Sequence, residues 1–167
     1  MIIDRSAQRC LITPALVDQA LAFARPTIDL IRRDLTFAGE ERDNGILVVD
    51  ADGFKTRYVA KFGEGSWTVR INDGVYDIEG IAIEKLELAI RTELPSKIAV
   101  SLCPGQLRRG NFLWGGAVVD TDNRFGVSFS GFLDQTDEGI SSIVREAIRM
   151  CLQMKVRRMQ EGKICRL

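Results

Sequence analysis

The sequence predicts an α+β domain of three layers (α/β/α), in which a mainly antiparallel sheet of five to six strands lies between helices. Three patterns support this prediction. Stretches that alternate apolar and polar residues come in pairs joined by tight turns, which is typical of β-hairpins. Stretches with apolar residues three and four positions apart lie between these pairs, as expected of amphipathic helices. The apolar faces of such a sheet are too extensive for one helix to cover, so we expect helices on both faces.

The length and the charge of the chain limit the possible classes of protein. Its 167 residues suit one domain, because domains usually have about 100–200 residues. We expect the core over residues 14–152, with residues 1–12 and 160–167 peripheral. The 23 lysines and arginines balance the 23 aspartates and glutamates, so no net charge favours nucleic acid or a membrane surface. No apolar run approaches the ~20 residues of a membrane helix, and the first residues lack a signal-peptide pattern. We therefore expect a cytoplasmic protein that binds neither nucleic acid nor membranes.

The first helix is expected over residues 14–37. Thr13 is a good N-cap, and Pro14 suits the first helical position, where a missing N–H has no partner to lose. Apolar residues then recur at helical spacing on both sides of Pro26, and proline bends or breaks a helix. This pattern predicts either one kinked helix or two helices that abut.

A first hairpin is expected over residues 46–62, where an apolar strand is followed by Asp52-Gly53, a strong hairpin-turn signal. In the return strand aromatic residues alternate with lysine and arginine, which predicts a sheet with unlike faces. A third strand is expected over residues 66–71, with a short extension over residues 75–78.

The second half of the chain contains a similar succession of elements. An amphipathic helix is expected over residues 79–94, ended by Pro95, and then a short strand over residues 97–102. A second hairpin is expected over residues 115–131, because an apolar strand, a polar turn and an alternating strand follow one another there. A last helix is expected over residues 134–159, with acidic residues in its first turn, where they favour the positive end of the helix dipole.

The chain contains no histidine, and this excludes several kinds of site. The common routes of serine, cysteine and metal-dependent hydrolysis need an imidazole as base or ligand. Neither these routes nor histidine-ligated haem or zinc is expected, and we predict no metal site. The four cysteines show no C-x-x-C spacing, which favours free thiols in a reducing compartment. Cys103 is either a reactive thiol or, as we favour, a small hydrophobic residue.

The best candidate for a binding site is the basic and aromatic segment before the second hairpin. Two adjacent arginines can clamp a carboxylate in a forked geometry, and a tryptophan offers an apolar wall to a planar ligand. Two glycines let a ligand approach the backbone, and a serine can supply a hydroxyl if its side of the strand faces the pocket. The predicted ligand is a small acidic or planar molecule, bound by Arg108, Arg109, Trp114, Gly115, Gly116 and Ser128. In the alternative interpretation, which we favour, both arginines lie in solvent and Trp114 lies in the core.

Several short motifs follow one another within residues 14–152. They are Val48-Val49-Asp50-Ala51-Asp52-Gly53, Gly115-Gly116-Ala117-Val118-Val119-Asp120, Gly126-Val127-Ser128, Gly131 and Asp137-Glu138. Their order and spacing resemble the GlcG/HbpS-like family. The resemblance implies a profilin-like fold and a homo-oligomer; some members bind haem or corrinoid, and others lack an assigned activity. Residues 96–113 depart from the family pattern. A histidine ligand to haem cannot carry over, although cysteine, methionine or tyrosine can ligate iron, so the cofactor stays unknown.

Three functions are compatible with these features. The first is a non-catalytic small-ligand-binding or sensory accessory protein, which the resemblance and the missing acid–base groups favour. The second is an enzyme that acts on a small organic acid through arginine and carboxylate residues, with Asp77, Glu79 and Asp134 as candidates. The third is an oligomeric scaffold.

A symmetric homo-oligomer is also expected from the apolar residues themselves. Some of them lie off the main helical and strand stripes, where a partner copy can bury them. These residues are Leu88, Phe112 and Phe132.

Overall fold

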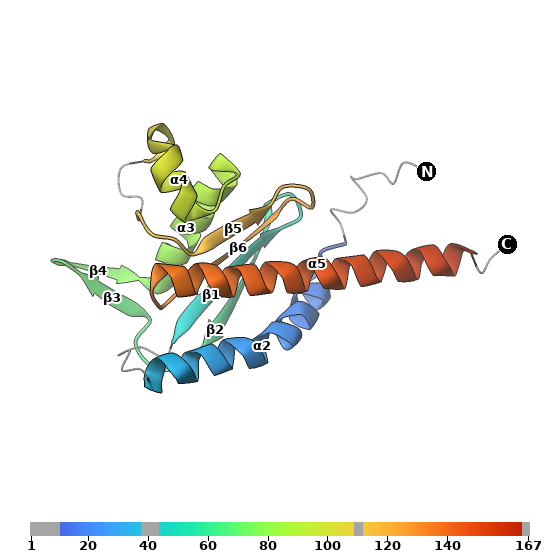
Figure 1. Cartoon of the computed structure of the whole chain (residues 1–167), viewed down its shortest axis with the longest axis horizontal. Helices are drawn as coiled ribbons and strands as arrows, with labels where there is room; N and C mark the ends of the chain where they lie inside the picture. Colours follow the sequence, from blue (N-terminus) through green and yellow to red (C-terminus); the bar gives the residue numbers. More distant parts are fainter. Residues whose placement is uncertain (1–10, 38–43, 109–111, 165–167) are drawn as a thin grey trace.

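The computed structural model describes residues 11–37, 44–108 and 112–164, and it confirms an α+β fold (Figure 1). In chain order its elements are α2 (Pro14–Phe37), β1 (Gly45–Ala51), β2 (Thr56–Phe62), β3 (Thr68–Ile71), β4 (Gly74–Asp77), α3 (Ile78–Thr92), α4 (Ser96–Leu102), the 3-10 helix η1 (Pro104–Gln106), β5 (Ala117–Asp120), β6 (Phe125–Ser130) and α5 (Asp134–Ile164). Both predicted hairpins and the three long predicted helices are present, and α5 continues beyond its predicted end.

The strands divide between two sheets. The main sheet has four antiparallel strands in the order β2-β1-β6-β5, and β3 pairs with β4 in a separate two-stranded sheet. The described strands therefore do not form the predicted single sheet of five to six strands. The turn at Asn72 and Asp73, with Asn72 in the left-handed region at φ 51°, folds β4 back onto β3, so these two strands pair with each other.

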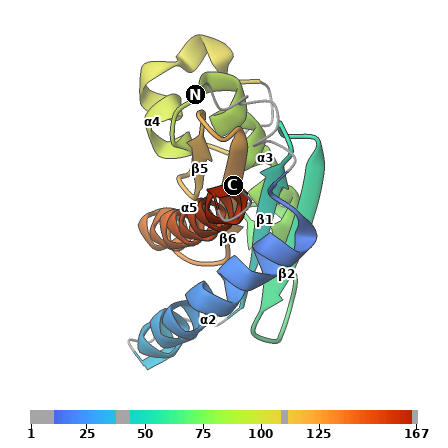
Figure 2. The ribbon, with the colours of Figure 1, turned by 90° about the vertical axis from the view of Figure 1, so that its right-hand side faces the viewer.

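Helices cover both faces of the main sheet, as predicted (Figure 2). β1 lies in the centre of the sheet, and all of its residues are buried. Because side chains alternate along a strand, Leu47 and Val49 point to a core shared with α2 and α5, whereas Ile46 and Val48 point to a smaller core under α3. This burial on both faces explains why β1 is a continuous apolar run.

α2 is one bent helix rather than two abutting helices. Pro26 lies inside it, and Figure 1 shows the helix curving along its length. A proline within a helix removes one backbone hydrogen bond and crowds the preceding turn, which bends the axis. The apolar stripe nevertheless continues past the proline, because Ala24 and Ile28 are both buried in the larger core.

Residues 97–102 belong to helix α4, so the predicted strand is wrong. Apolar and β-branched residues such as Ile98 and Val100 favour a strand by propensity, but tertiary packing overrides such preferences. The buried residues of α4 are Ser96 and Ala99, whose spacing of three places them on one face of a helix. α4 packs against α3 instead of joining the sheet.

The expectation that Leu88 is exposed is also wrong. Leu88 is 1% exposed, because α3 is covered by α4 as well as by the sheet and so buries more than one stripe. Phe132 is half-buried and stacks on Phe129, with the ring centroids 5.6 Å apart. Of the three residues expected at an interface, Phe112 and Phe132 thus keep only part of their surface exposed.

Candidate functional site

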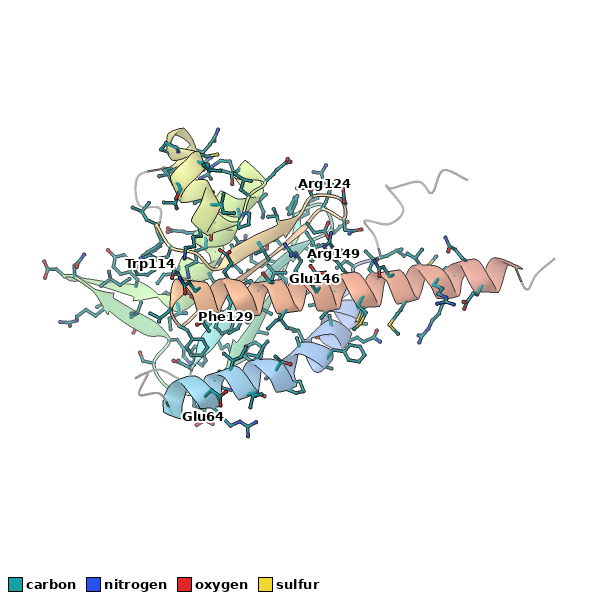
Figure 3. The ribbon with its side chains drawn as sticks, in the orientation of Figure 1. Glu64, Trp114, Arg124, Phe129, Glu146 and Arg149 are labelled. Carbon is teal, nitrogen blue, oxygen red and sulfur yellow. The ribbon has the colours of Figure 1, made fainter. Side chains whose placement is uncertain are left out.

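Two aromatic residues of the segment that leads into β5, Phe112 and Trp114, form a cluster with Tyr76, which we call the aromatic cluster. Tyr76, on β4, meets Phe112 edge to face with the centroids 5.2 Å apart, and Phe112 lies 5.4 Å from Trp114 at an interplanar angle of 37°. Tyr76 and Trp114 are 41% and 39% exposed. Trp114 is therefore not in the core, and the alternative that placed it there is wrong. Figure 3 shows Trp114 near the first turn of α5.

The two glycines after Trp114 are buried, and they are needed because the protein itself fills the space beside them. A Cβ on Gly116, whose φ is +134°, would lie 2.7 Å from the Phe129 carbonyl oxygen and 2.9 Å from Lys85 Nζ. A Cβ on Gly115 would lie 3.2 Å from Glu138 Oε2. At Gly116 the groups that approach closely belong to the chain itself, so the approach of a ligand to these glycines stays a prediction.

Lys85 of α3 and Asp137 of α5 form a buried ion pair beside Gly116. Lys85 Nζ lies 2.9 Å from Asp137 Oδ2, and both side chains are 1% exposed. The other oxygen, Asp137 Oδ1, accepts a hydrogen bond from the Phe132 amide at 2.9 Å. Burial raises the pKa of Asp137 to about 6, although the charge of Lys85 and the hydrogen bonds to this carboxylate act to lower it. The pair joins α3 to α5 at the start of β5.

Three serines lie in or near this polar region and are fully buried. Ser141 Oγ donates to the Gly116 carbonyl oxygen at 2.6 Å, and Ser96 Oγ accepts from the Ala117 amide at 3.1 Å. Ser128 Oγ has no hydrogen-bond partner among the described residues. Ser128 lies opposite Ala117 in the sheet, on the face covered by α3, so its hydroxyl is beneath that helix and does not line the open surface of the aromatic cluster.

Two glutamates, Glu84 and Glu138, flank the aromatic cluster. In the described part of the chain, the Oε2 atom of each is buried without a hydrogen-bond partner. Burial raises the pKa of Glu84, and the charge of Glu87 raises it further, whereas a hydrogen bond from the Phe112 backbone lowers it. Burial also raises the pKa of Glu138. One carboxylate thus lies at Phe112 and the other beside Gly115.

The structure brings together only part of the predicted site. Trp114, Gly115 and Gly116 are adjacent, and Ser128 is buried under α3. Arg108 lies at the exposed surface, and Arg109 lies outside the described residues. The arginine clamp therefore stays a prediction.

The sequence analysis did not single out Lys85 or Glu84, and it noted Glu138 only as part of a short acidic motif. A signal for Lys85 was present, because it falls three residues after Ala82 and four before Ala89, within the buried stripe of α3. A lysine at such a position needs a buried partner. The partner, Asp137, is not recognisable from spacing, since it lies 52 residues away in sequence.

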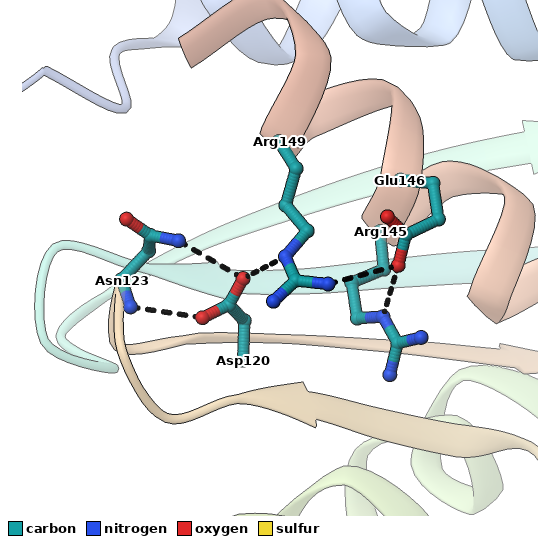
Figure 4. A network of polar contacts seen from close by, with 5 residues as sticks. All are labelled: Asp120, Asn123, Arg145, Glu146 and Arg149. Carbon is teal, nitrogen blue, oxygen red and sulfur yellow. Dashed lines mark hydrogen bonds and ion pairs between the residues drawn. The ribbon is translucent and has the colours of Figure 1, made fainter. Parts of the chain in front are cut away.

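A second polar network ties the β5–β6 turn to α5 (Figure 4). The buried carboxylate of Asp120 accepts a hydrogen bond from the backbone N–H of Asn123 at 2.9 Å. It also forms an ion pair with Arg149 Nε at 2.6 Å. Arg149 also contacts Glu146 at 3.2 Å. Every charged group of this network has a partner, so we assign it to stability.

The two described cysteines, Cys103 and Cys151, are free thiols. Cys151 is buried, and burial raises the pKa of its thiol, which makes it less nucleophilic. Cys103 is half-buried at the end of α4. Cys10 and Cys165 lie outside the described residues. Within residues 11–37, 44–108 and 112–164, no group of three or more Cys, Asp or Glu side chains could hold a metal ion.

Comparison with known proteins yields no match to a protein-family model, to a curated protein or to a solved structure. The GlcG/HbpS-like family therefore stays a prediction. Among the described helices, none is long and apolar enough to cross a membrane.

Proposed function

We propose that this chain is a non-catalytic small-ligand-binding or sensory accessory protein of the GlcG/HbpS-like type, with a profilin-like fold. The observation that carries the proposal is the aromatic cluster, which keeps a tryptophan and a tyrosine partly in solvent beside two half-buried glutamates. Each glutamate has a buried oxygen without a hydrogen-bond partner among the described residues. Exposed aromatic surface next to unsatisfied polar groups is typical of a binding site. The ligand binds over Trp114, between β4 and the first turn of α5.

The arrangement of the ionisable groups supports binding rather than catalysis. The strongest candidate for proton transfer, the Lys85–Asp137 pair, is closed off from solvent, and a catalytic group must reach its substrate. Asp77 caps α3 by accepting from the Gly80 amide at 2.9 Å, and Asp134 pairs with Lys97 at 3.4 Å. Two of the three carboxylates of the enzyme hypothesis therefore already have structural partners.

A thermal-shift screen followed by calorimetry tests this function. The panel contains hemin, cobalamin, small organic acids, and planar amines and heterocycles. We expect at least one compound to raise the Tm of the parent chain, and Trp114→Ala to abolish that increase. Phe23→Ala is the matched control, since Phe23 is an exposed aromatic residue on α2. A panel without a hit, or a hit that persists in Trp114→Ala, would contradict the proposal.

A further inference from the structure

The aromatic cluster and its two flanking glutamates indicate what kind of ligand the site prefers. We propose that this ligand is a planar cation with N–H donors, which stacks on Trp114 and donates hydrogen bonds to Glu84 and Glu138. The inference rests on the proposed binding function of the aromatic cluster. It differs from the acidic ligand that the sequence predicts.

The rings form a platform of fixed orientation. Tyr76 supports Phe112 edge to face, and Phe112 supports Trp114 in a tilted stack. Gly74 makes room for this arrangement, because a Cβ there would lie 2.6 Å from the Tyr76 ring. The exposed surface of Trp114 is flat and electron-rich, so it attracts cations and stacks on planar groups.

The two glutamates supply the hydrogen-bond acceptors. Glu84 Oε2 and Glu138 Oε2 are buried without a hydrogen-bond partner among the described residues, and an unpaired buried acceptor destabilises the protein. N–H groups of a ligand would satisfy both oxygens with charge-assisted hydrogen bonds. Both glutamate side chains are half-buried and keep part of their surface in solvent. Since the terminal torsion of glutamate is broad, rotation of the carboxyl group can bring the unpaired oxygen to the surface.

The charges around these two carboxylates also favour a cation. Glu87 acts on Glu84 and Asp134 acts on Glu138, and both raise the pKa of their neighbour as negative charges do. Lys97 is the positive group that acts on Glu138, and it is itself paired with Asp134. A carboxylate ligand placed here would be repelled by the glutamates, whereas a planar cation would be attracted.

Three small probes of nearly the same shape test the inference, namely benzamidine, benzamide and benzoate, whose charges at neutral pH are positive, zero and negative. Calorimetry with the full chain measures the affinity of each. We expect benzamidine to bind about tenfold or more tightly than benzamide, which corresponds to one charge-assisted hydrogen bond. We expect no binding of benzoate at the same concentrations.

Variants identify the groups responsible. Glu84→Gln and Glu138→Gln keep the shape of the side chain, and each should weaken benzamidine binding about tenfold and benzamide binding by a smaller factor. Glu64→Gln is the control, because it removes the same charge from an exposed turn, distant from Trp114 in Figure 3. Thermal unfolding establishes that each variant is folded.

The possible results distinguish failure of this inference from failure of the proposed binding function. Benzoate bound more tightly than benzamidine, or benzamidine binding that neither glutamate variant weakens, overturns the inference but leaves the binding function standing. If none of the three probes binds while another compound of the screen binds at Trp114, the inference also fails on its own. If no compound at all binds, both proposals fail.

Discussion

Lys85 is the residue whose replacement reports most directly on the buried ion pair. In Lys85→Met the carboxylate of Asp137 loses the positive charge that lowers its pKa, so its pKa rises above the value of about 6 that it has in the parent chain. At pH 8 the variant must hold an unpaired buried charge, and we expect it to lose about 3–5 kcal/mol of unfolding free energy.

The pH dependence follows from the direction of this shift. The folded state of the variant binds a proton on Asp137 up to a higher pH than the unfolded state does. The variant therefore keeps its unfolding free energy at low pH and loses it as the pH rises through the folded-state pKa of Asp137. Urea unfolding should show a deficit that is large at pH 8 and small at pH 5. Lys97→Met, which breaks a surface pair, should change stability by ~1 kcal/mol or less at either pH. An equal deficit for Lys85→Met at both pH values would contradict this account.

Gly116 is a backbone position that tolerates substitution poorly. Its φ of +134° is strained for an L side chain, and a Cβ would meet the backbone oxygen of Phe129 at 2.7 Å. Because neither group can move without disturbing the start of β5, we expect Gly116→Ala to destabilise the protein by about 1–3 kcal/mol or more. Gly105→Ala is the control: a Cβ there meets no atom within 4 Å. Chemical unfolding of both variants measures the difference, and equal stabilities would disprove the expectation.

At the residue scale, the site was only partly predictable from sequence. The aromatic and glycine residues at positions 114–116 could be recognised because their chemistry differs from that of their neighbours. The Lys85–Asp137 pair and the unpaired oxygens could not, since they depend on how α3 and α5 approach each other. Such contacts join residues that are distant in sequence, and no local pattern encodes them.

At the element scale, α3 begins at a well-defined cap that can be tested. Asp77 has extended dihedral angles and accepts from the Gly80 amide at 2.9 Å. Removing this acceptor leaves a helix N–H without a partner, so Asp77→Ala should lower stability by about 0.5–2 kcal/mol. Asp73→Ala, in the exposed β3–β4 turn, should change stability by less than about 0.5 kcal/mol. Thermal unfolding distinguishes the two, and a neutral Asp77→Ala would show that the cap is not needed.

The elements with strong periodicity were predicted well, and the short helix α4 was not. The helix over 14–37 and both hairpins follow from spacing and turn chemistry alone. α4 was missed because seven residues carry too few turns for a helical period to appear, and the β-branched residues then favour a strand. The split between two sheets was missed because pairing between β3 and the main sheet is not a local property.

At the scale of the whole molecule, we expect a homo-oligomer. Several apolar side chains on the described surface are more than half exposed, among them Val75 on β4, Leu113 before β5 and Leu133 before α5. Val75 and Leu113 are next in sequence to residues of the aromatic cluster, and a second copy of the chain could bury exposed apolar side chains of this kind. Light scattering should give a multiple of the 18.6 kDa chain mass. A monomer at micromolar concentration would contradict this expectation.

The most direct test of the central claim, that a small ligand binds over Trp114, uses the fluorescence of that residue. The chain has two tryptophans, so Trp67→Phe leaves Trp114 as the single emitter. We expect benzamidine, or another compound selected by the screen, to change the emission of Trp114 saturably, with the same dissociation constant that calorimetry gives. Binding detected by calorimetry while the emission of Trp114 stays constant would contradict the claim and place the ligand elsewhere on the protein.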